Sequence, residues 1–134
     1  MQNKDLGLLI LRLSLGLMMI PHGINKALHA DALGYIQHLL AEKNLPEFIS
    51  YGVFIGEILA PLLVAVGYRT RLSALIMVFT GVAVLFLAYS DKLFALTQHG
   101  GWYPELPSLF LFGALALVFT GGGKYAVSTK NKWD

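Results

Sequence analysis

Four long apolar runs constrain the fold of this chain more than any other feature of the sequence. They lie at residues 6–24, 48–68, 72–89 and 105–120. A helix needs about 20 mainly apolar residues to cross the hydrocarbon core of a bilayer, which is about 30 Å thick. The 134 residues are 56% hydrophobic and 13% charged, whereas ordinary soluble domains are about 25% charged. The sequence therefore predicts an all-α fold, an integral membrane four-helix bundle forming a single domain over residues 1–134.

The first and last of these runs differ from the other two. Arg12 and His22 interrupt the first run, for which a signal peptide is the rival interpretation. An arginine inside the apolar stretch and the lack of a small-residue cleavage site favour a membrane span. The last run reaches only about 24 Å at a rise of about 1.5 Å per residue. Trp102 and Tyr103 precede it, and we expect them to complete the crossing as an interfacial belt.

Lysine and arginine are distributed unevenly between the connections. With four spans, one side of the membrane receives six of them: Lys4, Arg69, Arg71, Lys124, Lys130 and Lys132. The other side receives three: Lys26, Lys43 and Lys92. Membrane proteins carry their excess of positive charge in the cytoplasmic connections. This bias predicts that the N- and C-termini are both cytoplasmic.

Residues 31–46, between the first two spans, are too polar to cross the membrane. Their apolar side chains follow helical spacing, at Leu33, Ile36, Leu39 and Leu40. Asp31 is a suitable N-cap and Pro46 a suitable terminator. The pattern predicts a short amphipathic helix at the outer interface. A helix packed as a cover on the mouth of the bundle fits the same periodicity.

Composition excludes several classes of function. The chain has no cysteine, so it forms no disulfide, thiolate metal site or iron–sulfur cluster of its own. Its net charge is only +2, and the basic residues form no stripe. A basic stripe is the usual mark of nucleic-acid binding, so we expect no nucleic-acid partner. The lipid bilayer is the expected surrounding.

Arg12 and Glu57 are charged residues inside predicted spans. Each costs about 2.5–3.5 kcal/mol at the centre of a membrane helix, so such residues point inward and find partners. Helix rise places Arg12 about 9 Å and Glu57 about 15 Å from the cytoplasmic side. An arginine side chain can cover that difference, which predicts an intramembrane ion pair between them. The pair could be functional, or it could only fix helix packing. Gly52 and Gly56 form a small-xxx-small motif that would bring Glu57 into the bundle.

A second polar group lies toward the predicted outer side. A stripe at helical spacing runs along the first span through Arg12, Gly16, Met19, Gly23 and Lys26. We expect His22, Lys26, Glu57 and Glu105 to line a pocket open to the outer face, suited to a ligand with a polar head and an apolar body. The rival interpretation is that His22 and Lys26 only reach the lipid headgroups.

The four histidines, His22, His29, His38 and His99, all fall on the predicted outer side. Imidazole binds metals and haem. No two of these histidines have the spacing of a metal-binding helix, and spacing is what makes such motifs specific. We therefore expect no metal or haem site.

Three segments of the chain resemble the DoxX family of small four-span bacterial membrane proteins. They are LRLSLGLMMIPHGINKA at 11–27, GEILAPLLVAVGYRTR at 56–71 and PELPSLFLFGALALVFTGGGKYAVS at 104–128. The chain departs from the family at residues 121–123, which are three glycines where members often have Gly-Pro-Gly.

This resemblance implies a location in the bacterial cytoplasmic (inner) membrane. The polar positions of the family correspond to Arg12, His22, Lys26, Glu57 and Glu105. The family is linked to membrane redox complexes, and its DoxD relatives to thiosulfate:quinone oxidoreductase. The resemblance therefore implies a quinone- or redox-linked subunit that receives electrons from soluble or membrane redox partners.

Two other functions stay open at this point. The first is a non-catalytic membrane scaffold for partner proteins, docking through residues 31–46. The second is a small-molecule or proton carrier with Glu57 as a titrating gate. Four short spans are few for a carrier, which would require a homo-oligomer. The residues by themselves leave open whether the protein is an enzyme, and they name no cofactor beyond a quinone.

Overall fold

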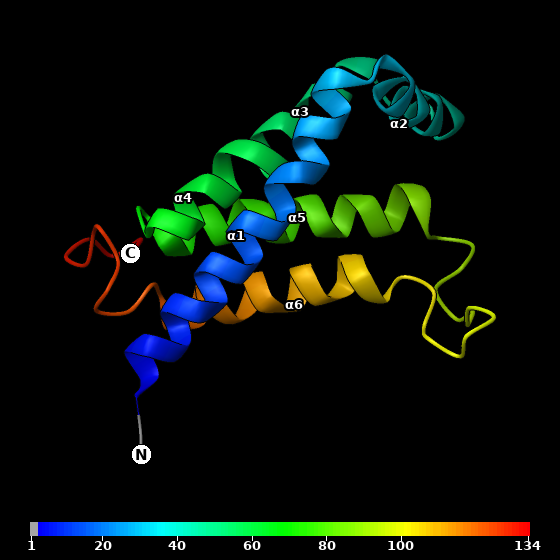
Figure 1. Cartoon of the computed structure of the whole chain (residues 1–134). Helices are drawn as coiled ribbons and strands as arrows, with labels where there is room; N and C mark the ends of the chain where they lie inside the picture. The colour runs from blue at the N-terminus through cyan, green and yellow to red at the C-terminus, as the bar shows by residue number, and fades with distance from the viewer. Residues whose placement is uncertain (1–2) are drawn as a thin grey trace.

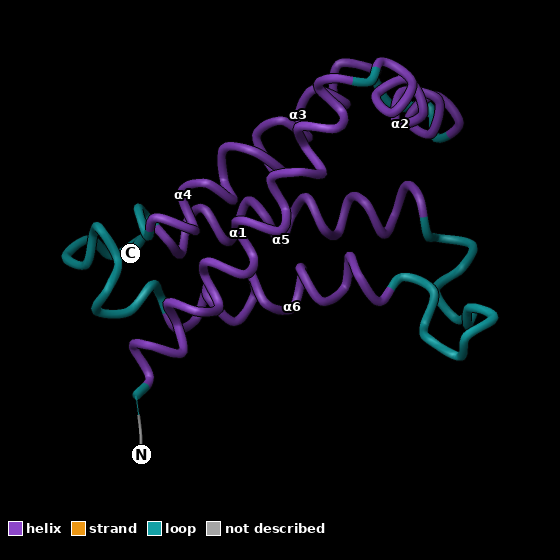
Figure 2. Tube along the Cα trace, viewed as in Figure 1, coloured by secondary structure: helices purple, strands orange, loops and turns teal. Residues whose placement is uncertain are grey.

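The structure is a computed structural model that describes residues 3–134, and within these residues it is all-helical. Helix α1 spans Lys4–Leu28, α2 spans Ala30–Glu42, α5 spans Thr70–Ala88 and α6 spans Glu105–Thr120. A fifth, continuous helical stretch covers Glu47–Val66. The described residues contain no β-strand, only an isolated bridge between Leu96 and Trp102. Figure 2 shows the helices and the loops that join them at the two ends of the molecule.

The stretch Glu47–Val66 changes its helical form along its length. It begins as the 3-10 turn η1 (Glu47–Tyr51) and continues as α3 (Gly52–Phe54). The π-helical turn η2 (Ile55–Leu59) and α4 (Ala60–Val66) follow. Pro61 explains the wider turn, because a proline ring clashes with the carbonyl group four residues earlier and donates no hydrogen bond to it. That carbonyl belongs to Glu57, which lies in the π-helical turn.

Within residues 3–134, three helices are long and apolar enough to cross a membrane: Lys4–Leu28, Glu47–Val66 and Thr70–Ala88. The fourth predicted span, α6, is apolar but has only 16 residues. Figure 1 shows α6 running alongside α5, while α1 crosses this pair obliquely. The boundaries predicted for the fourth run coincide with those of α6, and those of the other runs differ by a few residues.

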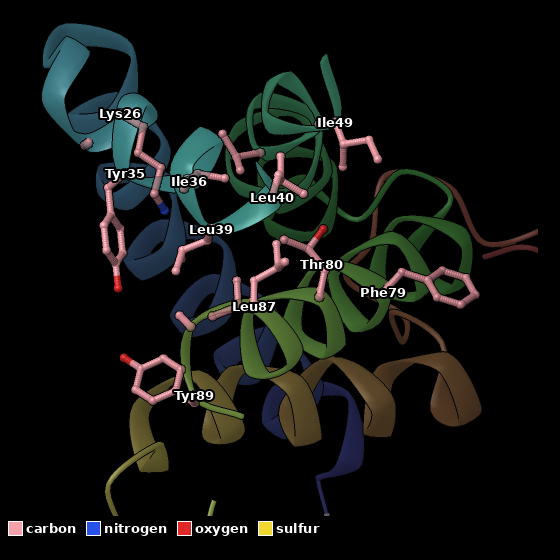
Figure 3. A pocket seen from close by; sticks show the side chains of 16 residues that line it. Lys26, Tyr35, Ile36, Leu39, Leu40, Ile49, Phe79, Thr80, Leu87 and Tyr89 are labelled. Carbon is pink, nitrogen blue, oxygen red and sulfur yellow. The ribbon is translucent and has the colours of Figure 1, made fainter. Parts of the chain in front are cut away.

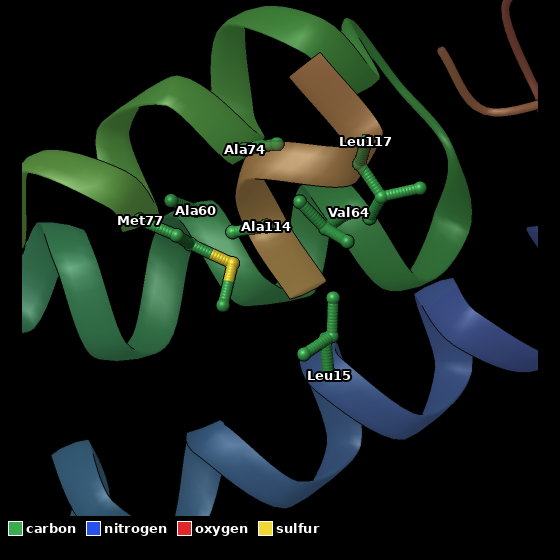
Figure 4. Packing of buried hydrophobic residues seen from close by; sticks show 7 residues of the cluster. All are labelled: Leu15, Ala60, Val64, Ala74, Met77, Ala114 and Leu117. Carbon is green, nitrogen blue, oxygen red and sulfur yellow. The ribbon is translucent and has the colours of Figure 1, made fainter. Parts of the chain in front are cut away.

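The hydrophobic core lies where α1, α4, α5 and α6 meet. It consists of Leu15, Ala60, Val64, Ala74, Met77, Ala114 and Leu117, and Figure 4 shows these side chains converging from the four helices. Alanine at three of these positions lets the backbones approach closely, as is usual between helices in membranes. Most of the other large apolar side chains lie on the outer surface, where lipid can cover them.

The glycine stripe predicted along α1 is buried. A Cβ atom at Gly16 would lie 2.7 Å from the Cβ of Ala65, and one at Gly23 would lie 3.0 Å from the Cβ of Glu57. The first distance is shorter than real Cβ contacts and the second is at the tight limit, so glycine at both positions lets α1 approach the second span this closely. Arg12 lies on the same buried face and is 0% exposed.

Helix α2 packs onto one end of the bundle as a cover. It contacts α1, η1 and α5, and Figure 1 shows it at the end of α1 that is remote from both termini. Its Leu40 side chain is fully buried. The structure therefore shows this helix packed against the bundle, and its position at the outer membrane interface stays a prediction. The helix ends before Asn44, whose φ of 59° lies in the left-handed region.

The two ends of the chain meet at the opposite end of the bundle. The Lys124 amide donates to the Asp5 carboxylate (2.8 Å), and the Arg71 amide donates to the carbonyl of Trp133 (2.9 Å). Arg69 forms an ion pair with Asp134 at 3.2 Å. Hydrogen bonds and an ion pair thus connect the segment after α6 to the turn between the second and third spans. The start of α1, the segment after α6 and this turn therefore lie at the same end of the bundle.

Candidate functional site

The site is built around an ion pair between α1 and the π-helical turn. The Lys26 Nζ atom donates to both carboxylate oxygens of Glu57, at 2.7 Å and 2.6 Å. The Glu57 side chain is 6% exposed and that of Lys26 is 21% exposed. Gly23 on α1 leaves room for the backbone of Glu57, and Gly56 leaves room for Thr80 on α5. Glu57 is therefore held between two helices, with its carboxylate aimed at Lys26.

This pairing corrects the predicted ion pair between Arg12 and Glu57. The Arg12 Nη1 atom donates to the carbonyl of Ala65 at 3.1 Å. Ala65 lies eight residues beyond Glu57, which is about 12 Å along a helix. The prediction relied on the long arginine side chain to cover the difference in depth between the two residues, but in the structure that side chain reaches the end of α4 instead. Packed against each other, the two spans set Arg12 beside the end of α4 and Lys26 beside Glu57.

Arg12 has few partners for a buried guanidinium. Within residues 3–134, its Nε and Nη2 atoms are buried and have no hydrogen-bond partner. The side chain lies next to Gly67, where its Nη1 atom occupies the space that a Cβ atom would need. Gly67 ends α4 with a φ of 84°, a conformation that glycine adopts without strain. Arg12 thus bridges α1 to the end of the second span.

A cavity of about 180 Å³ opens beside the ion pair, and its mainly apolar lining includes the polar side chains of His22, Lys26 and Glu57. Three of the four residues predicted to share a pocket therefore do share one. The His22 ring packs edge-on against Phe110 of α6, with 5.9 Å between the ring centres. Glu105 does not line this cavity. It begins α6 as an exposed residue beside Gly101, so its carboxylate lies outside the pocket.

A second and larger cavity, of about 430 Å³, lies beneath α2. Its walls come from α2, from the start of the second span and from α5, and they are mainly aliphatic. Figure 3 shows the side chains that point into it, among them Leu39, Leu40 and Leu87. Four residues line both cavities: Lys26, Thr80, Val84 and Tyr89. The two cavities are therefore neighbours that share a wall. We call them the polar chamber and the apolar chamber.

The sequence contained little sign of the apolar chamber. Tyr35, Thr80 and Tyr89 line it, but none of them stands out within its own segment. Thr80 is one of two threonines in α5, and its hydroxyl donates to the carbonyl of Ile76 at 2.9 Å. The one usable signal was the Gly52-x-x-x-Gly56 motif. Gly56 packs against Thr80, while a Cβ atom at Gly52 would meet nothing within 4 Å.

The chemistry available at this site is acid–base and hydrogen-bonding chemistry. Lys26 supplies donors, Glu57 supplies acceptors, and the His22 imidazole can donate or accept a hydrogen bond. Among residues 3–134, no three histidine, aspartate or glutamate side chains come together in a group that could hold a metal ion. An apolar cavity with a few convergent polar groups is the usual form of a small-molecule site.

Long apolar helices around a buried ion pair define a small multi-pass integral membrane protein. Comparison with models of protein families matches residues 7–90 to the DoxX family. The match covers more than half of the chain, which therefore belongs to the DoxX family. No curated protein and no solved structure matches the chain. The resemblance of residues 104–128 to the family lies outside the matched range and stays a prediction.

Proposed function

We propose that the protein binds a quinone in the polar chamber and serves as the quinone-linked membrane subunit of a redox or oxidative-stress complex. The observation that carries this proposal is the Lys26–Glu57 pair, a buried charged pair that lines a cavity with mainly apolar walls. A pair with only a structural role needs no cavity beside it. A quinone needs an apolar slot together with a few polar groups for its carbonyl oxygens, and both are present here.

The residues of the polar chamber have complementary roles in this proposal. The Lys26 ammonium donates a hydrogen bond to a carbonyl oxygen of the ligand. Glu57 holds Lys26 in place, and His22 exchanges protons with the outer surface. A bound quinone would supply two-electron, two-proton redox chemistry, with the electrons coming from a reduced partner protein. Without cysteine, the chain itself offers no thiol for that role.

We place the protein in the bacterial cytoplasmic membrane with both termini in the cytoplasm and with α6 as a fourth span. The distribution of lysine and arginine supports this orientation. The contacts that join Asp5 to Lys124 and Arg69 to Asp134 support placing these segments on one common side. In this orientation the polar chamber belongs to the outer half of the bilayer. The aromatic residues Trp102 and Tyr103 flank the shorter helix α6 at the same level.

Quinone binding by the purified protein tests the proposal. A tritiated benzoquinone without a tail is titrated against the protein in nanodiscs. Glu57→Gln and His22→Ala are each expected to weaken binding by about tenfold, since one lost charged or polar contact is worth about 1.4 kcal/mol or more. Glu105→Gln is the matched control, because Glu105 lies outside the chamber, and it should leave binding unchanged. Unchanged binding in both chamber variants contradicts the proposal.

A scaffold function is the second candidate, and one observation favours it. The loop between α5 and α6 carries Phe94, whose side chain is 99% exposed. Phe48, at the start of the second span, is 72% exposed. Large apolar side chains of this kind mark contact with lipid or with a partner protein. Partner proteins that copurify with the wild-type chain, but not with a Phe94→Ser, Phe48→Ser variant, would support the scaffold.

A further inference from the structure

We infer that the apolar chamber holds the hydrocarbon tail of the ligand whose head occupies the polar chamber. The ligand class is therefore a long-tailed amphiphile, such as a prenylated or alkylated quinone, and not a small tailless one. This inference rests on the proposed function, because it assigns the head group to the Lys26–Glu57 site. It adds a separate subsite, formed by α2, the start of the second span and α5.

Adjacency of the two chambers is the first argument. Lys26, Thr80, Val84 and Tyr89 belong to the lining of both. A ligand that occupies both chambers therefore has to pass only between these side chains. The larger chamber, at about 430 Å³, lies within the range of about 300–1,000 Å³ that is usual for small-molecule pockets.

Polarity within the apolar chamber is the second argument. Figure 3 shows the polar atoms of Lys26, Tyr35 and Tyr89 on one side of the view, and Ile49 and Phe79 on the other. One end of the chamber thus suits a polar group and the other end suits a hydrocarbon. Apart from Thr80, whose hydroxyl is engaged with its own helix, the remaining walls are apolar. A ligand that is polar throughout would leave its groups unpaired there.

The depth of the chamber is the third argument. Its lining on α5 runs from Phe79 to Ala88, which are nine steps apart, or about 14 Å along a helix. That length is about half of the roughly 30 Å hydrocarbon core, so it suits a tail that reaches through one leaflet. Tyr35 and Phe79 at its edges are 57% and 66% exposed. The chamber is therefore open at the side, where a tail can enter from the bilayer.

Gly52 offers a clean way to fill the chamber. It belongs to the lining, its φ is −61°, and a Cβ atom added there would meet nothing within 4 Å. Gly52→Leu therefore occupies space in the chamber without straining the backbone. Gly34→Leu is the matched control, because Gly34 on α2 also has nothing within 4 Å and does not line the chamber.

The experiment compares two tritiated probes on the full chain in nanodiscs of fixed lipid composition. One is a tailless benzoquinone, and the other carries a decyl tail on the same ring. Overpacking costs about 1–3 kcal/mol, so Gly52→Leu should weaken binding of the decyl probe by about tenfold. It should leave the tailless probe unchanged, and Gly34→Leu should leave both unchanged. The tail enters the chamber from the bilayer, which is as apolar as the chamber. The free energy of tail binding therefore comes from packing contacts and not from transfer out of water.

The outcomes separate this inference from the proposed function. Equal effects of Gly52→Leu on the two probes, or no effect on the decyl probe, would overturn the tail subsite. If neither quinone binds the wild-type protein, the proposed function fails, and tritiated lauric acid tests the tail subsite without a quinone. Binding of lauric acid that Gly52→Leu weakens and Gly34→Leu does not would uphold the subsite. Absent or insensitive binding of lauric acid would overturn it.

Discussion

The ion pair between Lys26 and Glu57 should couple α1 to the second span, and a double-mutant cycle measures that coupling. Removing one partner of a buried pair costs about 3–5 kcal/mol, because a lone charge stays buried. The two partners differ in exposure, with 6% for the Glu57 side chain and 21% for that of Lys26. The two single substitutions should therefore have unequal effects.

Lys26→Met leaves the more deeply buried carboxylate without a partner, and we expect it to cost about 3 kcal/mol of the free energy of unfolding. Glu57→Gln leaves an ammonium that can extend toward the headgroups, as lysine does near membrane interfaces. We expect that change to cost about 1 kcal/mol, in the range of partly solvated pairs. The double variant removes both charges, so it should be less destabilised than the sum of the two by about 1–2 kcal/mol.

Reversible unfolding in mixed detergent micelles, followed by circular dichroism, measures these differences. The control is a second cycle that combines Arg12→Met with Glu57→Gln. Arg12 bonds to Ala65 and not to Glu57, so this cycle should be additive within about 0.5 kcal/mol. The reasoning is refuted if the Lys26–Glu57 cycle is additive, or if Lys26→Met is no worse than Glu57→Gln. A coupled Arg12–Glu57 cycle would restore the pairing first predicted.

Three further predictions concern the membrane orientation, the packing of Gly56 and the C-terminal segment of the chain. In this cysteine-free chain, Asp91→Cys should react with an impermeant thiol reagent from outside and Thr129→Cys should not; the reverse pattern would invert the orientation. Gly56→Ala should destabilise the protein by about 1–3 kcal/mol in the same micelle assay, because its Cβ would lie 2.8 Å from that of Thr80, and an unchanged stability would contradict this packing. Burial alone would raise the pKa of the Asp134 carboxyl, but hydrogen bonds from Ser128, Asn131 and Arg69 outweigh it and lower the pKa. A carboxyl group with a lowered pKa stabilises the folded state above about pH 4. This stabilisation is lost as the pH falls further. The protection of the amides of residues 124–134 against exchange, taken relative to their intrinsic exchange rates at each pH, should therefore fall in acid, and Asp134→Asn should remove that pH dependence.

Much of the fold could be read from the sequence, because membrane spans are a local property. A helix in lipid satisfies its own backbone hydrogen bonds, so an apolar run of sufficient length implies the helix without reference to the rest of the chain. The boundaries of α6 were predicted to the residue for this reason. The burial of Arg12 and of the glycines on α1 followed from helical periodicity and from the cost of charge in hydrocarbon.

Only the tertiary structure decided which charges meet. The partner of Glu57 depends on how far α1 slides along the second span and on the π-helical turn ahead of Pro61. Neither is encoded in the spacing within one helix. Lys26 could be assigned to the headgroups from the sequence, yet it lies 2.6 Å from the Glu57 carboxylate.

The apolar chamber likewise exists only in three dimensions. Its walls come from α2, from residues around Gly52 and from the last turns of α5, which are far apart in the chain. Each segment looks like an ordinary apolar helix face by itself, because periodicity reports which side of a helix is buried and not what lies opposite. A cavity depends on which helices face each other across it. The sequence therefore determined the helices and their buried faces, while the packing of α2 against α5 determined the space between them.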